Sequence, residues 1–110
     1  MGTKVGRVKK QPERFKVIKS ARDSLFLISL VQWKKELDRP LLVSVARTSG
    51  PAVLRNRWKR LVKNWFYSEG LKVIPGQSVW IRYNRTKSLN KILSYQEWSR
   101  LLHEQAKFLS

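Results

Sequence analysis

Segments with the pattern of β-strands are the first feature that emerges when hydrophobic and polar positions are followed along the chain. Residues 25–33 (LFLISLVQW) form an apolar run rich in strand-forming side chains and without helix caps. Residues 41–46 and 79–83 alternate with a period of two, as residues on one face of a strand do. The pattern therefore predicts three strands, and residues 33–40 are expected to join the first two as a hairpin-like connection.

Two further segments have helical periodicity. Residues 51–70 begin with Pro51, which suits a first helical turn, and end at Gly70, which suits a helix exit. A last helix is expected to begin at Ser94, because Glu97 stands three residues later, as a capping box requires. The predicted order is strand, strand, helix, strand, helix, which indicates an α+β fold with helices packed on a sheet.

The N-terminal segment, residues 1–22, has no such pattern. It is polar, basic and interrupted by Pro12, so we expect a basic arm or a short helix there. A chain of 110 residues can bury one modest core, and we expect a single domain over residues 1–110. No secretory signal and no run of roughly 18 apolar residues is visible, so no membrane association is expected. The absence of cysteine fits a cytoplasmic location.

The charge of the chain indicates what kind of partner it has. Twenty-four Lys and Arg against seven Asp and Glu give a net charge of +17. A compact protein with that much self-repulsion is expected to bind a polyanion, and nucleic acid is the usual one. Between Asp38 and Glu97 the only acidic residue is Glu69, so we expect the polyanion along the middle of the chain and along the basic N-terminal segment.

The helix predicted over residues 51–70 divides into two faces at about 100° per residue. Its apolar stripe consists of Leu54, Trp58, Leu61, Val62 and Trp65. The opposite side carries a basic row of Arg55, Lys59 and Lys63, with Asn56 and Arg60 beside it and Arg57 near the edge of the stripe. Like charges one turn apart cost a helix roughly a few tenths of a kcal/mol per pair. We interpret the row as a phosphate-binding face, in which Asn56 can hydrogen-bond a base edge or a 2′-hydroxyl group.

The same helix resembles a known signature. The string Arg55-Asn56-Arg57-Trp58-Lys59-Arg60, with Gly50, Ala52 and Val53 before it and Leu61, Lys63 and Phe66 after it, is similar to the RNR signature of the bacterial ribonuclease P protein family. Arg47 stands where the family tends to have Lys, and Lys63 stands where it tends to have Arg, so both positions keep their charge. A weaker resemblance covers most of the chain, although the segment before the first long strand looks short and its first helix is expected to be shortened.

The resemblance implies a fold and a role. The fold is a ribosomal-protein-like two-layer sandwich: helices pack on one mixed β-sheet, and a left-handed βαβ crossover runs through the basic helix, against the usual right-handed rule. The role is that of the protein subunit of ribonuclease P, which binds the catalytic RNA and the 5′ leader of precursor tRNA. The implied contacts to the catalytic RNA are Arg47, Arg55, Asn56, Arg57, Lys59, Arg60 and Lys63.

In that role the catalyst is the RNA, and the residues of the chain agree with a non-catalytic protein. The single histidine, His103, has no cysteine and no clustered acids nearby, so neither a catalytic residue nor a protein-held metal is expected. Mg²⁺ is expected to be held mainly by RNA phosphates, and no small-molecule ligand is expected.

Contacts to a single-stranded leader require aromatic surface beside positive charge. Phe15 and Lys16 fit this requirement, although a core position for Phe15 stays open. Phe26 is a third candidate and, like Trp80, is a strand residue that could face either side of a sheet. Ser29 stands where a Tyr often lines the cleft of the family. The remaining helical tryptophans are interpreted as core residues: Trp58, Trp65 and Trp98.

Three other functions fit part of the pattern. A ribosomal or other structural RNA-binding protein would share the charge, and ribosomal RNA would then co-purify with it. A DNA-binding regulator would place the basic helix in a major groove and bind duplex DNA tightly. A nuclease acting alone would cleave precursor tRNA without added RNA. The ordered basic string on one helix favours the ribonuclease P subunit over all three.

Overall fold

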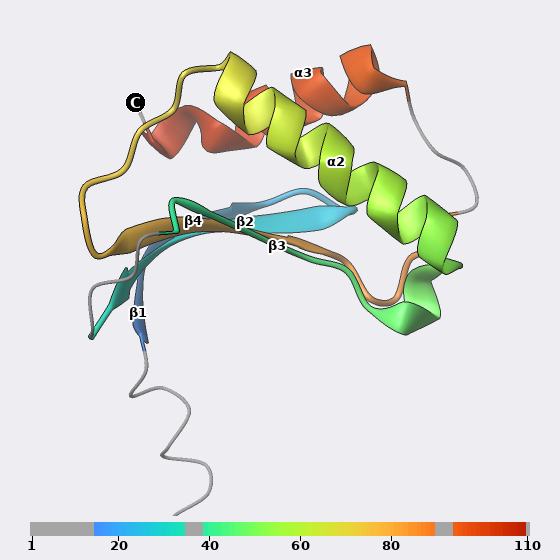
Figure 1. Cartoon of the computed structure of the whole chain (residues 1–110), viewed down its shortest axis with the longest axis horizontal. Coiled ribbons are helices and arrows are strands. Elements are labelled where there is room, and N and C mark those ends of the chain that lie inside the picture. The colour runs from blue at the N-terminus through green and yellow to red at the C-terminus, as the bar shows by residue number, and fades with distance from the viewer. Residues whose placement is uncertain (1–14, 35–38, 90–93, 110) are drawn as a thin grey trace, which may run out of the picture.

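The computed structural model describes residues 15–34, 39–89 and 94–109 of the 110-residue chain. Four strands form one mixed sheet in the order β1–β2–β4–β3. Their bounds are Phe15–Arg22 (β1), Phe26–Trp33 (β2), Leu41–Ser44 (β3) and Gln77–Tyr83 (β4). The helices α2 (Ala52–Ser68) and α3 (Tyr95–Gln105) cover one face of this sheet and leave the other face open (Figure 1). The 3-10 helices η2 (Arg47–Ser49) and η3 (Ala106–Leu109) precede α2 and follow α3. The predicted α+β class is confirmed.

Strand β1 corrects the expectation of an arm or short helix over residues 1–22. Its eight residues pair antiparallel with β2, from Phe15 opposite Trp33 to Arg22 opposite Leu27. Most side chains of β1 are exposed, so its hydrophobic pattern contained no strand signal. The strand forms because β2 offers it a buried partner for backbone pairing, a cause that lies outside its own sequence. Residues 1–14, the rest of the segment in which an arm or a short helix was expected, lie outside the described residues.

The hairpin-like connection expected over residues 33–40 is also corrected. Strands β2 and β3 are not neighbours, because β4 lies between them and pairs antiparallel with β2 and parallel with β3. Parallel neighbours need a long crossover, and α2 supplies it above the sheet (Figure 1). The β3–α2–β4 unit is therefore the crossover that the family resemblance implies.

The core lies between the sheet and the two helices. From the sheet it receives Phe26, Ile28, Val79, Ile81 and Tyr83, and from the helices it receives Trp58, Val62, Trp65, Phe66, Trp98 and Leu102. The ring of Trp58 lies edge-on to Tyr83 and Trp98, with centroids 5.2 Å and 5.8 Å away. Burial raises the pKa of Tyr83, whose hydroxyl donates a hydrogen bond to the carbonyl of Ser88 at 3.0 Å. The prediction that the three helical tryptophans are core residues is confirmed.

The predicted capping box at the start of α3 is confirmed as well. Ser94 Oγ accepts a hydrogen bond from the Glu97 amide at 3.2 Å, and Glu97 Oε1 accepts one from the Ser94 amide at 2.9 Å. These bonds fix where α3 begins and so set Trp98 against the sheet. None of the helices in the described part is long and apolar enough to cross a membrane.

Candidate nucleic-acid interface

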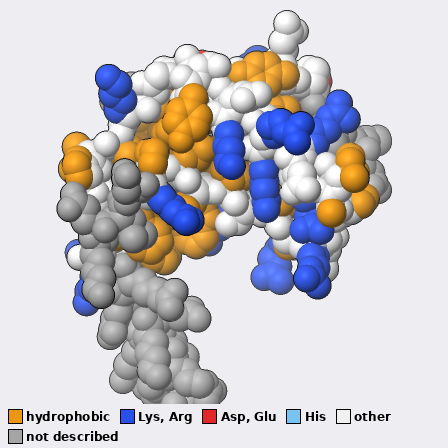
Figure 2. Space-filling view, in the orientation of Figure 1, with side chains coloured by type: hydrophobic (Ala, Val, Ile, Leu, Met, Phe, Trp, Pro, Cys, Tyr) orange, Lys and Arg blue, Asp and Glu red, His pale blue; other side chains and the backbone are white. Residues whose placement is uncertain are grey.

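Helix α2 buries one side and presents the other to solvent. Trp58, Val62 and Trp65 are fully buried, and Leu54 and Leu61 are partly buried, so the predicted apolar stripe is confirmed. Of the predicted RNA contacts on this helix, Arg55 and Lys59 are half-buried, and four are exposed: Asn56, Arg57, Arg60 and Lys63. Figure 2 shows Lys and Arg side chains gathered along α2 with no acidic group among them.

The start of α2 is held in place by tight packing. Arg55 Nε donates a hydrogen bond to the carbonyl of Gly50 at 3.0 Å, which ties the basic row to the turn before the helix. A side chain at position 50 would lie 3.3 Å from Leu89 Cβ, so glycine allows this turn to approach Leu89 closely. Arg47, the remaining predicted contact, is exposed on η2 just before this turn. The structure therefore brings the seven predicted contacts together along α2 and its entry.

Arg57, which lies near the edge of the apolar stripe, also lines a hollow at the surface. This hollow of about 610 Å³ lies between α2 and α3, and its walls include Arg57, Arg60, Asn64, Tyr95 and Glu97. No ion pair joins a Lys or Arg side chain of α2 to a carboxylate among residues 15–34, 39–89 and 94–109. These guanidinium and ammonium groups can therefore contact phosphates without first breaking an ion pair within the described residues.

The open face of the sheet carries an aromatic cluster, which we define as Phe15, Trp33 and Trp80. Phe15 packs edge-on against both tryptophans, with ring centroids 5.1 Å from Trp33 and 5.4 Å from Trp80. Each indole N–H donates to a serine on the same face: Trp33 to Ser78 Oγ and Trp80 to Ser44 Oγ, both at 2.9 Å. Fixed indole edges orient the rings, and all three remain partly exposed to solvent.

Positive charge lies directly beside this cluster. The guanidinium carbon of Arg82 sits 4.4 Å from the centroid of the Trp80 ring, which is cation–π geometry. Both side chains leave β4 on the open face, because residues two apart in a strand share a face. Aromatic rings next to a cation are the combination that single-stranded RNA recognition needs.

The structure separates the three residues predicted to contact a leader. Phe15 belongs to the aromatic cluster, whereas Phe26 is 1 % exposed and packs on Trp98 with ring centroids 5.9 Å apart, on the helix side of the sheet. Phe26 is therefore a core residue, and the prediction that it contacts RNA is wrong. Lys16 follows Phe15 and pairs with Gln32, so its side chain leaves β1 on the opposite face.

Sequence reasoning missed Trp33 and left Trp80 undecided. Both belong to the open face only because of how β2 and β4 pair. The sequence around each tryptophan does not indicate which face of the sheet its side chain occupies. Ser29, which stands where the family often has Tyr, is paired with Trp80 and is 1 % exposed. At this place in the sheet the aromatic ring comes from β4, and the small Ser29 lies beside it.

Comparisons with known proteins agree with this architecture. The family model for ribonuclease P matches residues 4–106. The ribonuclease P protein of Staphylococcus aureus has a TM-score of 0.62 and 18% identity over 98% of this chain and 90% of that protein. The ribonuclease P protein of Thermotoga maritima has a TM-score of 0.60 and 18% identity over 94% of this chain and 89% of that protein. No curated protein matches the sequence.

At these identities the solved structures show the shared fold, while the family model covers nearly the whole sequence. The fold, the basic α2 signature and the family match all agree. The chain belongs to the ribonuclease P protein family, and its role is that of an RNA-binding protein subunit of the endoribonuclease that processes precursor tRNA.

Proposed function

We propose that the chain divides its RNA contacts between two opposite faces. The basic row of α2 binds the catalytic RNA of ribonuclease P, and the open face of the sheet holds the single-stranded 5′ leader of precursor tRNA. The observation that carries this proposal is the aromatic cluster beside Arg82, on the face of the sheet that the helices leave uncovered. Unpaired bases can stack on these rings, whereas the bases of a duplex already stack on one another.

The α2 face has the chemistry for structured RNA. Its basic side chains extend from a rigid helix. Each Arg guanidinium group there can donate two hydrogen bonds to the oxygens of one phosphate. The neutral amide of Asn56 lies among them, exposed, and can bind a 2′-hydroxyl or a base edge. Contacts of this kind read the shape of a folded RNA backbone and depend strongly on salt.

Catalysis is assigned to the RNA in this proposal. Among the residues that the structure describes, no group of three or more His, Cys, Asp or Glu could hold a metal ion. We assign Mg²⁺ mainly to RNA phosphates, where it would supply the activated nucleophile and neutralise developing charge. The protein contributes binding of the leader and a positive field that lowers the repulsion between the two RNAs. We further propose that the complex acts in the cytoplasm and uses no small-molecule ligand.

Reconstitution with a bacterial ribonuclease P RNA tests the proposal. Cleavage of precursor tRNA is measured at low Mg²⁺ with no protein, with the native chain, and with Arg55, Lys59 and Arg60 changed together to Ala. The native chain should stimulate cleavage, and the triple variant should lose most of the stimulation because it binds the RNA weakly. The protein alone should not cleave.

A second triple variant controls for net charge. Lys19, Lys72 and Arg100 are exposed and lie outside both proposed surfaces. Changing them to Ala removes the same charge and should leave the stimulation nearly intact. Full stimulation by the α2 variant would show that α2 is not the RNA-binding surface, and no stimulation by the native chain would contradict the whole proposal. Circular dichroism of each variant checks that the fold is kept.

A further inference from the structure

The hollow between α2 and α3 brings cations together with an aromatic ring, an amide and an apolar wall. Arg57, Arg60 and Asn64 line it from α2. Tyr95, in the first turn of α3, adds a side chain that is 42 % exposed, and Leu61 adds the apolar wall. Binding of a phosphate alone would need only the two cations. The other groups therefore indicate a ligand that carries a planar ring as well as a phosphate.

The polar α2 residues of the hollow lie on one line along the helix. Arg57, Arg60 and Asn64 are spaced by three and four residues, which places side chains on the same helix face, and all three are exposed. At about 100° per residue, Arg55 and Lys59 lie about 160° around the helix from Arg57. The hollow is thus a separate part of the α2 surface, and it faces a different part of any RNA bound there.

The carboxylate of the hollow is occupied by its own helix. Among the described residues that line the hollow, Glu97 is the one acid. It accepts a hydrogen bond from the Ser94 amide at 2.9 Å, and Ser94 Oγ accepts one from the Glu97 amide at 3.2 Å. Because this carboxylate repels a phosphate, we expect the phosphate beside Arg57 and Arg60, at the α2 side of the hollow. Neither arginine is in an ion pair within the described part of the chain.

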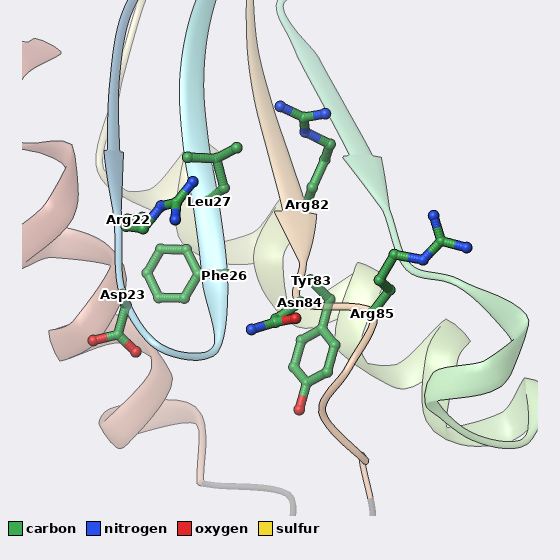
Figure 3. A pocket seen from close by; sticks show the side chains of 8 residues that line it. All are labelled: Arg22, Asp23, Phe26, Leu27, Arg82, Tyr83, Asn84 and Arg85. Carbon is green, nitrogen blue, oxygen red and sulfur yellow. The ribbon is translucent and has the colours of Figure 1, made fainter.

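The pocket at the β1–β2 turn has arginines but lacks a free ring. Figure 3 shows the guanidinium groups of Arg22, Arg82 and Arg85 spread across the end of the sheet, without converging on one point. The two rings that line this pocket belong to the core, because Phe26 and Tyr83 are both buried. Of these two pockets, the α2–α3 hollow is the one that offers cations and a ring to the same ligand.

The size of the hollow fits one nucleotide. Its volume of about 610 Å³ falls within the range of about 300–1,000 Å³ for pockets that enclose small organic ligands. A base within a duplex is paired and stacked and does not enter such a hollow. An unpaired base can turn out of its strand and stack on an aromatic side chain of a protein.

We infer that the hollow binds one unpaired nucleotide of the catalytic RNA. This inference rests on the proposed function of α2, because it requires that RNA on the α2 surface. The base stacks on Tyr95 against Leu61, and its phosphate contacts Arg57 and Arg60. The nucleotide is assigned to the catalytic RNA because α2 and α3 cover one face of the sheet, whereas the leader is assigned to the opposite face (Figure 1).

Asn64 gives the hollow a preference for one base. A side-chain amide has a donor and an acceptor side by side, and adenine offers the matching acceptor and donor at N7 and N6. Guanine presents two acceptors on the same edge, and a pyrimidine presents a single polar group there. Adenine should therefore bind about tenfold more tightly than any other base at this position.

The test combines chemical probing of a bacterial ribonuclease P RNA with measurement of its affinity for the protein. Dimethyl sulfate reports which unpaired adenines the native chain protects. One of them should regain its reactivity when Asn64→Ala or Tyr95→Leu is bound at saturating concentration. Each variant should bind the RNA about tenfold more weakly. Tyr95→Phe should behave nearly as the native chain does, because it keeps the ring.

Replacing that adenine in the RNA tests its contact with Asn64. With the native chain, another base at this position should lower the affinity about tenfold. With Asn64→Ala the same replacement should cost little, because the contact is already lost. Tyr67→Leu is the matched control for Tyr95→Leu, since Tyr67 is exposed on α2 but does not line the hollow. It should leave the protection of this adenine unchanged.

Three results would overturn the inference. Asn64→Ala and Tyr95→Leu could leave every protected adenine protected and the affinity unchanged. Tyr67→Leu could expose the same adenine as fully as Tyr95→Leu does. The costs of Asn64→Ala and of the adenine replacement could simply add. Circular dichroism checks the fold of each variant, and Asn64→Ala, at an exposed helical position, should keep the fold even if Tyr95→Leu does not. If the native chain does not bind the RNA at all, the proposed function itself fails.

Discussion

The two surfaces proposed to bind RNA differ in how they are built. The α2 surface comes from one continuous helix and presents mainly cations. The open face is assembled from four strands and presents aromatic rings, with cations concentrated at one end. Under the proposed function, one small domain binds a folded RNA by its phosphates and a single strand by its bases, and a shared core keeps the two surfaces apart.

That shared core is where a single change should have the largest effect. Trp58 is fully buried between the surfaces and contacts Tyr83 and Trp98. Replacing it with Ala should lower the free energy of unfolding by about 3–5 kcal/mol, because it leaves a large cavity. Urea denaturation followed by circular dichroism measures this loss, and both kinds of RNA binding should fall together.

Trp58→Phe is the matched control, since it keeps an aromatic ring in the core and should cost less. If Trp58→Ala weakened binding of the catalytic RNA but left leader binding intact in protein that is still folded, the two surfaces would not depend on a common core.

The α2 surface could be predicted from the sequence more fully than the open face, because one comes from a single helix and the other from four paired strands. The spacing of Arg55, Lys59 and Lys63 is local, so helical periodicity was sufficient to place them opposite the buried stripe. The capping box at Ser94 was equally local. By contrast, Phe15, Trp33 and Trp80 meet only through the pairing of three strands, and no spacing along the chain encodes that pairing.

Phe26 and β1 illustrate the same limit. Phe26 lies on the core side of its strand because of its register with Tyr83, and an apolar run such as residues 25–33 does not reveal which face is buried. Strand β1 has mostly exposed side chains and exists because β2 offers it a partner. The row that contains Arg22 and Arg82 was also hidden, because the two residues share it only through their pairings with Leu27 of β2.

A paired test of the two surfaces should give effects of intermediate size. Trp80→Ala should weaken leader binding by about 1–3 kcal/mol, the range for loss of one base stack, and should leave binding of the catalytic RNA unchanged. Lys59→Ala should do the reverse and should reduce the slope of log affinity for the catalytic RNA against log salt by about one. Equilibrium binding at several salt concentrations measures both.

The salt slope makes this pair of variants decisive. Stacking releases no counterions, so the slope for leader binding should be the same in Trp80→Ala as in the native chain. Tyr67→Ala is a suitable aromatic control, because Tyr67 is exposed and lies outside the aromatic cluster. If Trp80→Ala and Lys59→Ala each weakened both kinds of binding equally, the division of labour between the two faces would be refuted.

The smallest expected effect concerns acid and leaves both surfaces untouched. At the start of α3, the hydrogen bond from the Ser94 amide is the main cause that lowers the pKa of the Glu97 carboxyl below its ordinary value of 4.5. A carboxyl whose pKa is lower in the folded protein stabilises the fold above the unfolded value, and this contribution is lost as pH falls through the folded value. Stability should therefore decline below about pH 4.5 by a small component that Glu97→Gln lacks. Urea denaturation across this pH range measures the free energy of unfolding of the native chain and of Glu97→Gln. If the two free energies changed in parallel with pH, the capping carboxylate would not contribute. At neutral pH the variant should bind both RNAs as the native chain does, since Glu97 supplies no cation and no aromatic ring.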